Sequence, residues 1–156
     1  MKELQVTGKR GKRKFVLIDD EDFLKFNKWK WNLDLKGYAR RTNKRSKTIL
    51  LHRIIMGEPF GLQVDHINGD ILDNRKSNLR ICTFIQNRQN RKVHKNNKIG
   101  IKGVSFHTNA LRARIRVNGK EIFLGRFKTI EEASNAYNQS AKKYFGKFAR
   151  INICRQ

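Results

Sequence analysis

The feature that most constrains this chain is a polar run between Val64 and Cys82. It contains one histidine, three aspartates and three asparagines. The sequences Asn68-Gly69-Asp70 and Asp73-Asn74 are typical of turns and caps, whereas the ends of the run have strand character. The run therefore predicts a strand that carries Asp65 and His66, a long polar loop, and a second strand over 79–82.

Charge restricts the class of partner. Lysine and arginine total 36 against 13 acidic residues, a formal net charge of +23, so nucleic acid is the expected partner. An anionic membrane surface is the alternative, but no long basic amphipathic helix is present, and no apolar run approaches the roughly 18 residues of a membrane span. The first residues lack the apolar core of a signal peptide, which predicts the cytoplasm, that of the host if a phage encodes the chain.

The N-terminal third predicts a small mixed domain. A strand is expected over 14–18, followed by a helix with an N-cap and acidic first turn at 19–22. Tryptophans alternate with lysines near 29–31, and with 37–41 they indicate a hairpin. The apolar stretch 48–56 indicates a buried strand or a short helix.

The C-terminal third predicts a sheet and one helix. Strands are expected over 103–107, 111–117 and 121–127. Asn118-Gly119 favours a type I′ hairpin turn, and Thr129 with Glu132 forms a capping box for a helix that ends at Gly146. The expected apolar stripe of that helix consists of Ala133, Ala136, Tyr137, Ser140, Ala141 and Tyr144. Between the two halves, a helix over 83–92 with Thr83 as N-cap leads into a basic linker.

The polar run also carries candidate chemistry. Asp65 and His66 are adjacent on a strand, so their side chains should point to opposite faces. Asp65 could then hold a hard cation while His66 takes a proton from water, with Asn78 and Asn87 nearby on the second strand and the helix. The pattern predicts metal-assisted cleavage of a phosphodiester.

Other metal sites fit poorly. The acidic spacing and final glutamate of an EF-hand are absent, and no histidine or cysteine pair has zinc-finger spacing. Cys82 and Cys154 are far apart and are expected to be reduced, buried thiols.

The stretches 51–53, 64–66, 74–80 and 86–90 resemble the HNH homing endonucleases of phages and introns. The resemblance implies a ββα-metal (His-Me finger) fold that cuts double-stranded DNA. It implies that Asp65 and Asn87 bind a divalent cation, Mg²⁺ with Mn²⁺ as the alternative. It also implies that His66 is the general base, and that Asn78 ties the strands and orients the His66 ring. Arginines close in sequence could clamp phosphates: Arg53, Arg80 and Arg88.

Residues 100–153 resemble the plant ethylene-response-factor DNA-binding domain, on Lys102-Gly103-Val104, the stretch 123–127 and the helix 131–141. In that family the sheet lies in the major groove and the helix packs behind it. The implied contacts are Arg112, Arg114, Arg116 and Phe123, with Ser105, His107 and Arg126 secondary. Leu111 and Phe123 stand where that family has tryptophans.

The sequence thus predicts an α+β chain with a nuclease domain over 1–92 and a ββα-metal core at about 62–92. A basic linker follows over 93–99, and a three-stranded antiparallel sheet on one helix occupies 100–154. The expected function is a homing-type DNA endonuclease, with oligomeric state open. Two alternatives remain: a DNA-binding regulator with an inactive nuclease fold, and a basic RNA-binding protein of translation.

Overall fold

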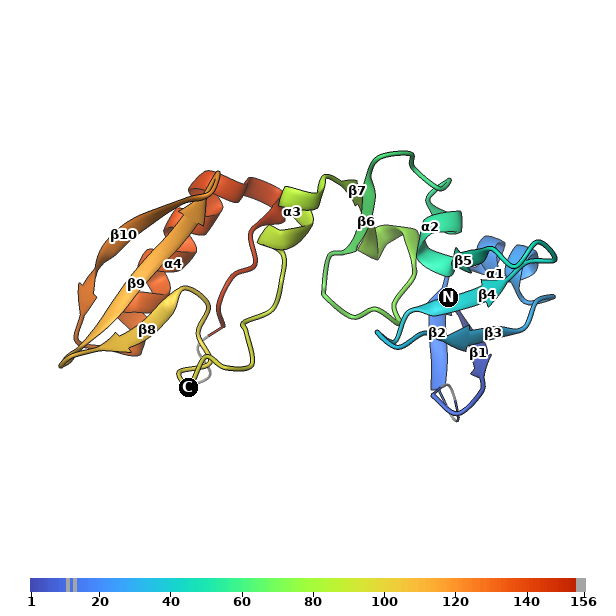
Figure 1. Ribbon diagram of the computed structural model, residues 1–156, viewed down its shortest axis with the longest axis horizontal. Helices are drawn as coiled ribbons and strands as arrows, with labels where there is room; N and C mark the ends of the chain where they lie inside the picture. Colours follow the sequence, from blue (N-terminus) through green and yellow to red (C-terminus); the bar gives the residue numbers. More distant parts are fainter. Residues whose placement is uncertain (11, 13, 154–156) are drawn as a thin grey trace. The chain divides into compact units, whose positions relative to one another are not determined.

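The computed structural model describes residues 1–10, 12 and 14–153 and has mixed α+β structure, as predicted. The chain divides into two compact units, Met1–Asn87 and Arg88–Gln156, and each contains sheets and helices (Figure 1). In the described part of the chain, no helix is both long and apolar enough to cross a membrane. Cys82 is a buried free thiol, as predicted, and Cys154 lies outside the described residues.

The first unit is built on a five-stranded sheet in the order β2-β1-β3-β4-β5. The strands are β1 (Lys2–Thr7), β2 (Lys14–Ile18), β3 (Trp31–Leu33), β4 (Ala39–Thr42) and β5 (Thr48–Leu50). β1 and β3 run parallel, and the remaining neighbours pair antiparallel. Apolar residues alternate along β1 and β2, so one face is buried at Leu4, Val6, Val16 and Ile18.

Short helices border this sheet. α1 (Asp20–Phe26) begins where the acidic turn predicts, but the side chain of the N-cap residue Asp19 makes no cap hydrogen bond. Its Oδ2 instead accepts from the backbone N–H of Lys76 at 2.8 Å, which fixes a distant loop. The stretch 48–56, predicted as a strand or a helix, contains both, because β5 runs directly into α2 (Leu51–Ile55).

The predicted hairpin is formed by β3 and β4. Trp31 begins β3 and is fully buried, and its Nε1 donates to the carbonyl oxygen of Phe26 at 3.0 Å. Trp29 lies before the strand, with the Arg41 guanidinium 4.1 Å from its ring centroid. The indole of Trp31 therefore ties the end of α1 to the sheet.

The polar run forms the predicted pair of strands. β6 (Gln63–His66) and β7 (Leu79–Cys82) are antiparallel, and a 3₁₀ turn, η1 (Lys76–Asn78), precedes β7. α3 (Phe84–Gln89) follows directly. Thr83 Oγ1 accepts from the N–H of Gln86 at 3.2 Å, and Gln86 Oε1 accepts from the N–H of Thr83 at 2.9 Å. This reciprocal capping starts α3 where the sequence predicts.

The predicted end of this helix, at residue 92, was wrong, because α3 ends at Gln89. The Nζ of Lys102 donates to the carbonyl oxygens of Gln89 and Arg91, at 2.5 and 2.8 Å. A helix terminus needs partners for its last carbonyls, and here an ammonium group supplies them. This lysine is distant in sequence, so local periodicity gave no sign of the stop.

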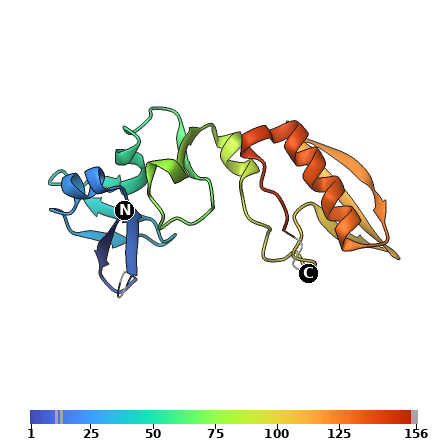
Figure 2. The same cartoon turned by 180° about the vertical axis from the view of Figure 1, so that it is seen from behind.

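The second unit is a three-stranded antiparallel sheet, in the order β10-β9-β8, with one helix on one face (Figure 2). The elements are β8 (Val104–His107), β9 (Ala110–Val117), β10 (Lys120–Phe127), α4 (Ile130–Phe145) and the 3₁₀ turn η2 (Gly146–Phe148). Asn118 and Gly119 have φ of 48° and 82°, as a type I′ turn requires. The predicted capping box at Thr129 and Glu132 is confirmed.

α4 packs on the sheet through residues spaced by four. Ala133, Tyr137 and Ala141 are buried, as predicted. Tyr144, also predicted on this stripe, is 42% exposed, and Phe145 is buried instead. The correction follows from helix geometry, because the four-residue spacing from Tyr137 through Ala141 continues to 145.

Gly103 provides a test of close packing in this unit. Its φ is 77°, and a Cβ would clash with the Tyr137 ring and lie 2.6 Å from the carbonyl oxygen of Arg114. We expect Gly103→Ala to lower the free energy of unfolding by about 3 kcal/mol through strain and overpacking. Gly119→Ala is the control: its φ is 82°, but a Cβ there meets nothing within 4 Å. That variant should lose about 1 kcal/mol. Equal losses in urea unfolding would contradict the packing account.

Candidate active site

β6 places the central residues of the polar run on opposite faces of one strand. Asp65 and His66 are adjacent, so their side chains alternate, and they are only 6% and 4% exposed. Gln63 shares the face of Asp65, and Val64 shares that of His66. The strand therefore presents a carboxylate on one side and an imidazole on the other.

Asp65 is paired with an arginine across the two-stranded sheet. The register sets Asp65 opposite Arg80, and its Oδ2 accepts from Nη2 at 2.6 Å and from Nε at 2.8 Å. The Arg80 side chain is 13% exposed, so the pair is largely shielded from water. A buried carboxylate without a partner would be strongly destabilising, and the guanidinium compensates for its lost hydration.

The His66 ring lies in a cluster of aromatic rings. Its centroid is 5.2 Å from that of His52 on α2 and 6.0 Å from that of Tyr38, and these two rings are 5.0 Å apart. Its Nε2 lies 3.4 Å from Oδ1 of Asn74. Burial lowers the pKa of His66, while Asn74 and the nearby aspartates oppose the shift. The ring is therefore neutral near pH 7 and able to accept a proton.

Polar side chains hold the loop between β6 and β7. Asn78 Oδ1 accepts from the N–H of Asn68 at 3.0 Å, and Asn78 Nδ2 donates to the carbonyl oxygen of Asp73 at 2.7 Å. Arg75 lies 2.6 Å from the Asp73 carboxylate and holds the pKa of that carboxyl below its usual value. These bonds connect Asn78, at the end of the loop, to the beginning and middle of the loop. The orientation of the His66 ring by Asn78 stays a prediction.

Asn74 was not predicted as a site residue, and its only signal in the sequence is its position within the polar run. It is 1% exposed, and its N–H donates to the carbonyl oxygen of Leu17 on β2 at 2.8 Å. The N–H of Leu17 in turn donates to the carbonyl oxygen of Leu72 at 2.9 Å. The loop is thus fixed to the five-stranded sheet, and this long-range contact brings the Asn74 amide to His66.

Asn87 reaches β6 from α3. Its Nδ2 donates to Oε1 of Gln63 at 2.6 Å. Because Gln63 and Asp65 share one face of β6, this bond sets Asn87 on the face that carries the carboxylate. The amide nitrogen is used in the bond, so the amide oxygen is the atom suited to ligate a cation.

The oxygen atoms of Asp65 and Asn87 are suited to a hard divalent cation. Among the residues that the structure describes, no three His, Cys, Asp or Glu side chains are grouped as a metal site. The oxygen atoms that could hold a cation on this face of β6 are those of the Asp65 carboxylate and the Asn87 amide, completed by water. Mg²⁺ is bound by one or two carboxylates and keeps several waters, and Mn²⁺ also suits oxygen ligands, whereas zinc favours sulfur and nitrogen.

The arginines predicted to contact phosphate have different surroundings. Arg53 donates from Nη1 and Nη2 to the carbonyl oxygens of Leu62 and Pro59, at 2.9 and 2.8 Å, which gives it a structural role. Arg80 is paired with Asp65, and Arg88 is exposed. Phosphate contacts by these three side chains stay predictions.

His52 should make the stability of the first unit depend on pH. Its ring is 6% exposed, and Nδ1 has no hydrogen-bond partner among the described residues. Burial, followed by the charges of His66 and Arg53, lowers the pKa of His52 to about 3. Unfolded histidine has a pKa of about 6.5, so stability is full above that pH and falls as the pH drops toward 3.

We therefore expect the free energy of unfolding to fall by about 2 kcal/mol as the pH decreases from 6.5 to about 5, because His52 takes up a proton in the unfolded state but not in the folded state. Urea unfolding followed by tryptophan fluorescence measures this change in the first unit, which contains both tryptophans of the chain. His52→Phe keeps a ring in the cluster but cannot take up the proton, so its stability should vary less with pH. An unchanged pH dependence in this variant would contradict the assignment.

The exposed face of the second sheet carries the residues predicted to contact nucleic acid. Arg112, Arg114 and Arg116 alternate along β9, and Phe123 on β10 is 54% exposed. The strand register places the remaining predicted contacts on this face as well: Ser105, His107 and Arg126. Glu121, an acidic residue on the same face, was not predicted from the sequence.

The comparisons with known proteins concern both units. Residues 50–89, which contain α2, β6, β7 and α3, match the family model described as HNH endonuclease. A protein of Acanthamoeba polyphaga mimivirus named "Uncharacterized HNH endonuclease L560" is 34% identical over 149 residues, covering 92% of this chain and 77% of that protein. The chain belongs to the HNH endonuclease family. "Protein 3.8" of Escherichia phage T7 is 30% identical to this HNH protein over 95 residues, 60% of this chain and 78% of that protein. No solved structure matches.

Family membership makes the HNH chain a nuclease, a hydrolase for which DNA is the implied substrate. HNH nucleases generally use a divalent metal ion, in agreement with the oxygen donors of Asp65 and Asn87. Both relatives come from viruses.

Proposed function

We propose that this chain is a metal-dependent, homing-type DNA endonuclease with a ββα-metal core over about 62–92. One observation carries the proposal: β6 presents the Asp65 carboxylate on the face that Asn87 reaches through Gln63, and the His66 imidazole on the other. The proposed domains are a nuclease over 1–92, a linker over 93–99 and a DNA-binding domain over 100–154.

His66 is the proposed general base. Its Nε2 faces the amide oxygen of Asn74, which favours the tautomer with the proton on Nε2 and makes Nδ1 the basic nitrogen. The buried, neutral ring can then accept a proton from the attacking water. Tyr38 and His52 pack against the ring and restrict its orientation.

Asp65 and Asn87 are the proposed ligands of the divalent cation, Mg²⁺ in the first place. When bound, such a cation offsets negative charge on the scissile phosphate and the leaving oxygen. Arg80 keeps the Asp65 carboxylate in position through its two hydrogen bonds to Oδ2. Gln63 orients the Asn87 amide in the same way.

The alternative function is a DNA-binding regulator with an inactive nuclease fold. The pairing of Asp65 with Arg80 favours it, because a guanidinium already compensates the carboxylate. Incubation of the purified chain with supercoiled plasmid separates the two functions. Open-circular or linear product in Mg²⁺ or Mn²⁺, absent in EDTA, supports the nuclease, whereas a gel shift without cleavage of either plasmid or genomic DNA in either metal supports the regulator.

We also propose that the sheet of the second unit binds double-stranded DNA, as in ethylene-response-factor domains. The face opposite α4 carries three arginines on one strand, and the guanidinium of Arg112 lies 5.3 Å from the ring centroid of Phe123. Guanidinium groups contact phosphates and guanine edges, so such a face suits a DNA groove.

Removal of two of these arginines should weaken DNA binding. The double variant Arg112→Ala and Arg114→Ala should flatten the log–log salt dependence of affinity by about 2, as two lost phosphate contacts would. Fluorescence anisotropy with a labelled duplex at several salt concentrations measures this slope. The control, Lys142→Ala with Lys143→Ala, removes the same charge from the exposed side of α4 and should change the slope less. Equal slopes for the two double variants would contradict the assignment of the sheet.

A further inference from the structure

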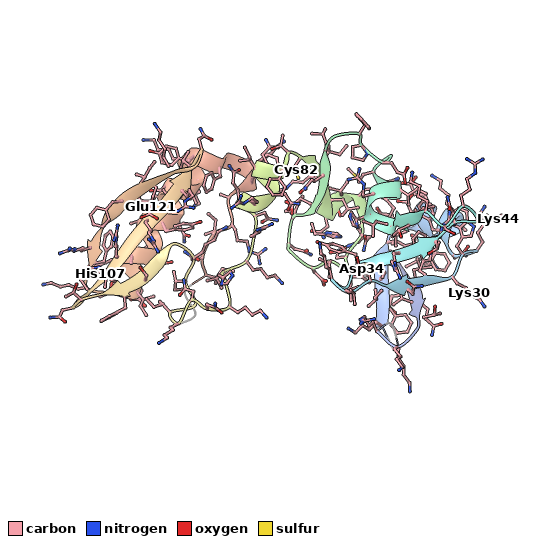
Figure 3. All side chains as sticks on the ribbon, viewed as in Figure 1. Lys30, Asp34, Lys44, Cys82, His107 and Glu121 are labelled. Atoms are coloured by element: carbon pink, nitrogen blue, oxygen red, sulfur yellow. The ribbon has the colours of Figure 1, made fainter. Side chains whose placement is uncertain are left out.

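Glu121 is an acidic residue on the sheet face that carries Arg112, Arg114 and Arg116, near the turn between β9 and β10. It lies on β10 opposite Arg116 in the strand register and is labelled in Figure 3. Its carboxylate oxygens lie 3.6 Å from Nη2 of Arg112, 3.2 Å from Nη1 of Arg114 and 3.9 Å from Nη2 of Arg116. One carboxylate therefore faces three guanidinium groups.

The carboxylate of Glu121 contributes little to the stability of the second unit. Glu121 is exposed, and the core of the unit lies on the other side of the sheet, where Ile115 and Tyr137 are buried under α4. Exposed ion pairs contribute little to stability. A carboxylate on a surface that binds DNA also repels phosphates. The position of Glu121 therefore favours a role in how the arginines meet DNA.

We propose that Glu121 is a specificity-determining residue, which restrains the three arginines and so weakens sequence-independent binding. This inference rests on the proposed function of the sheet. Sequence-independent affinity comes from phosphate contacts, and the Glu121 carboxylate competes with phosphate oxygens for the three guanidinium groups. Arg114 donates to both carboxylate oxygens of Glu121, at 3.3 and 3.2 Å, and a guanidinium oriented in this way favours bidentate contacts to base edges over mobile contacts to phosphates.

The test compares Glu121→Gln with Glu131→Gln in the full chain. Both substitutions remove one negative charge, but Glu131 is exposed in the first turn of α4, on the far side of the sheet. The probe is a labelled duplex of random sequence, about 30 base pairs long, with affinity measured by anisotropy over a range of salt. Glutamine has the shape of glutamate, and circular dichroism checks that each variant is folded.

We expect Glu121→Gln to bind the random duplex about fivefold more tightly at low salt, with a log–log salt slope steeper by about 1. Glu131→Gln should change affinity less than about twofold, because its charge lies away from the DNA-binding face. Equal affinities of the two variants would overturn the inference. Weaker binding by Glu121→Gln would also overturn it, because the carboxylate would then strengthen sequence-independent binding instead of weakening it.

The double variant Arg112→Ala and Arg114→Ala distinguishes failure of this inference from failure of the proposed function. If it binds the random duplex as tightly as the unmodified chain, the sheet is not the DNA-binding face and the proposed function of this unit fails. If it binds more weakly while Glu121→Gln matches Glu131→Gln, the sheet binds DNA and only the role of Glu121 is refuted.

Discussion

Replacement of His66 by alanine should reduce the rate of DNA cleavage by about 10²- to 10⁴-fold, the usual contribution of a general base. DNA affinity should remain close to that of the unmodified chain, because the ring is 4% exposed and the proposed DNA-binding face lies in the second unit. Single-turnover cleavage in Mg²⁺, together with a gel shift in EDTA, separates the two quantities.

The matched control is His94→Ala, which removes an exposed histidine of the basic segment that is predicted to link the domains. It should cut DNA as fast as the unmodified chain. Because alanine leaves a gap beside His52 and Asn74, His66→Gln provides a variant of similar size that preserves packing. Undiminished cleavage by either His66 variant would remove this residue from the role of general base.

Replacement of Asp65 by asparagine should abolish cation binding and reduce cleavage by at least about 10²-fold, because the remaining protein ligand is a neutral amide. The two side chains have nearly the same shape, so the loss comes from charge. Titration with Mn²⁺ by calorimetry measures cation binding without any DNA. Unfolding experiments should also show destabilisation, because Arg80 loses its charged partner.

Asp70→Asn is the control for this substitution. Asp70 is exposed in the loop that follows β6, and its Oδ1 accepts from the N–H of Leu72 at 3.0 Å, a bond that an amide oxygen can also make. Cation binding and cleavage should therefore be preserved. Retention of Mn²⁺ affinity in Asp65→Asn would exclude this carboxylate as a ligand.

Elements with local signals were predictable from the sequence. A type I′ turn requires left-handed backbone at both central residues, which Asn118 and Gly119 adopt, and the strands on either side of the turn formed as expected. Thr83 and Thr129 each begin a helix, because their capping partners lie three residues ahead. The parallel pairing of β1 with β3 was not predicted, because it joins segments whose own patterns do not specify a neighbour.

The candidate site also contains both residues that the sequence identified and partners that only the structure reveals. Asp65 and His66 were found as candidates because adjacent residues on a strand face opposite sides. Their partners were not assigned these roles: Arg80 meets Asp65 only through the register of β6 and β7, and Asn74 meets His66 only because its loop is fixed to β2. Roles that depend on such long-range pairing require the folded structure.

The most direct test of the account compares plasmid cleavage by the unmodified chain, His66→Ala and Asp65→Asn under identical single-turnover conditions, in Mg²⁺ and in EDTA. We expect supercoiled DNA to be cut in Mg²⁺ only, and only by the unmodified chain, while all three proteins still shift the DNA in a gel. Cleavage that persists in EDTA, or that both variants retain in Mg²⁺, would contradict a metal-dependent nuclease centred on Asp65 and His66.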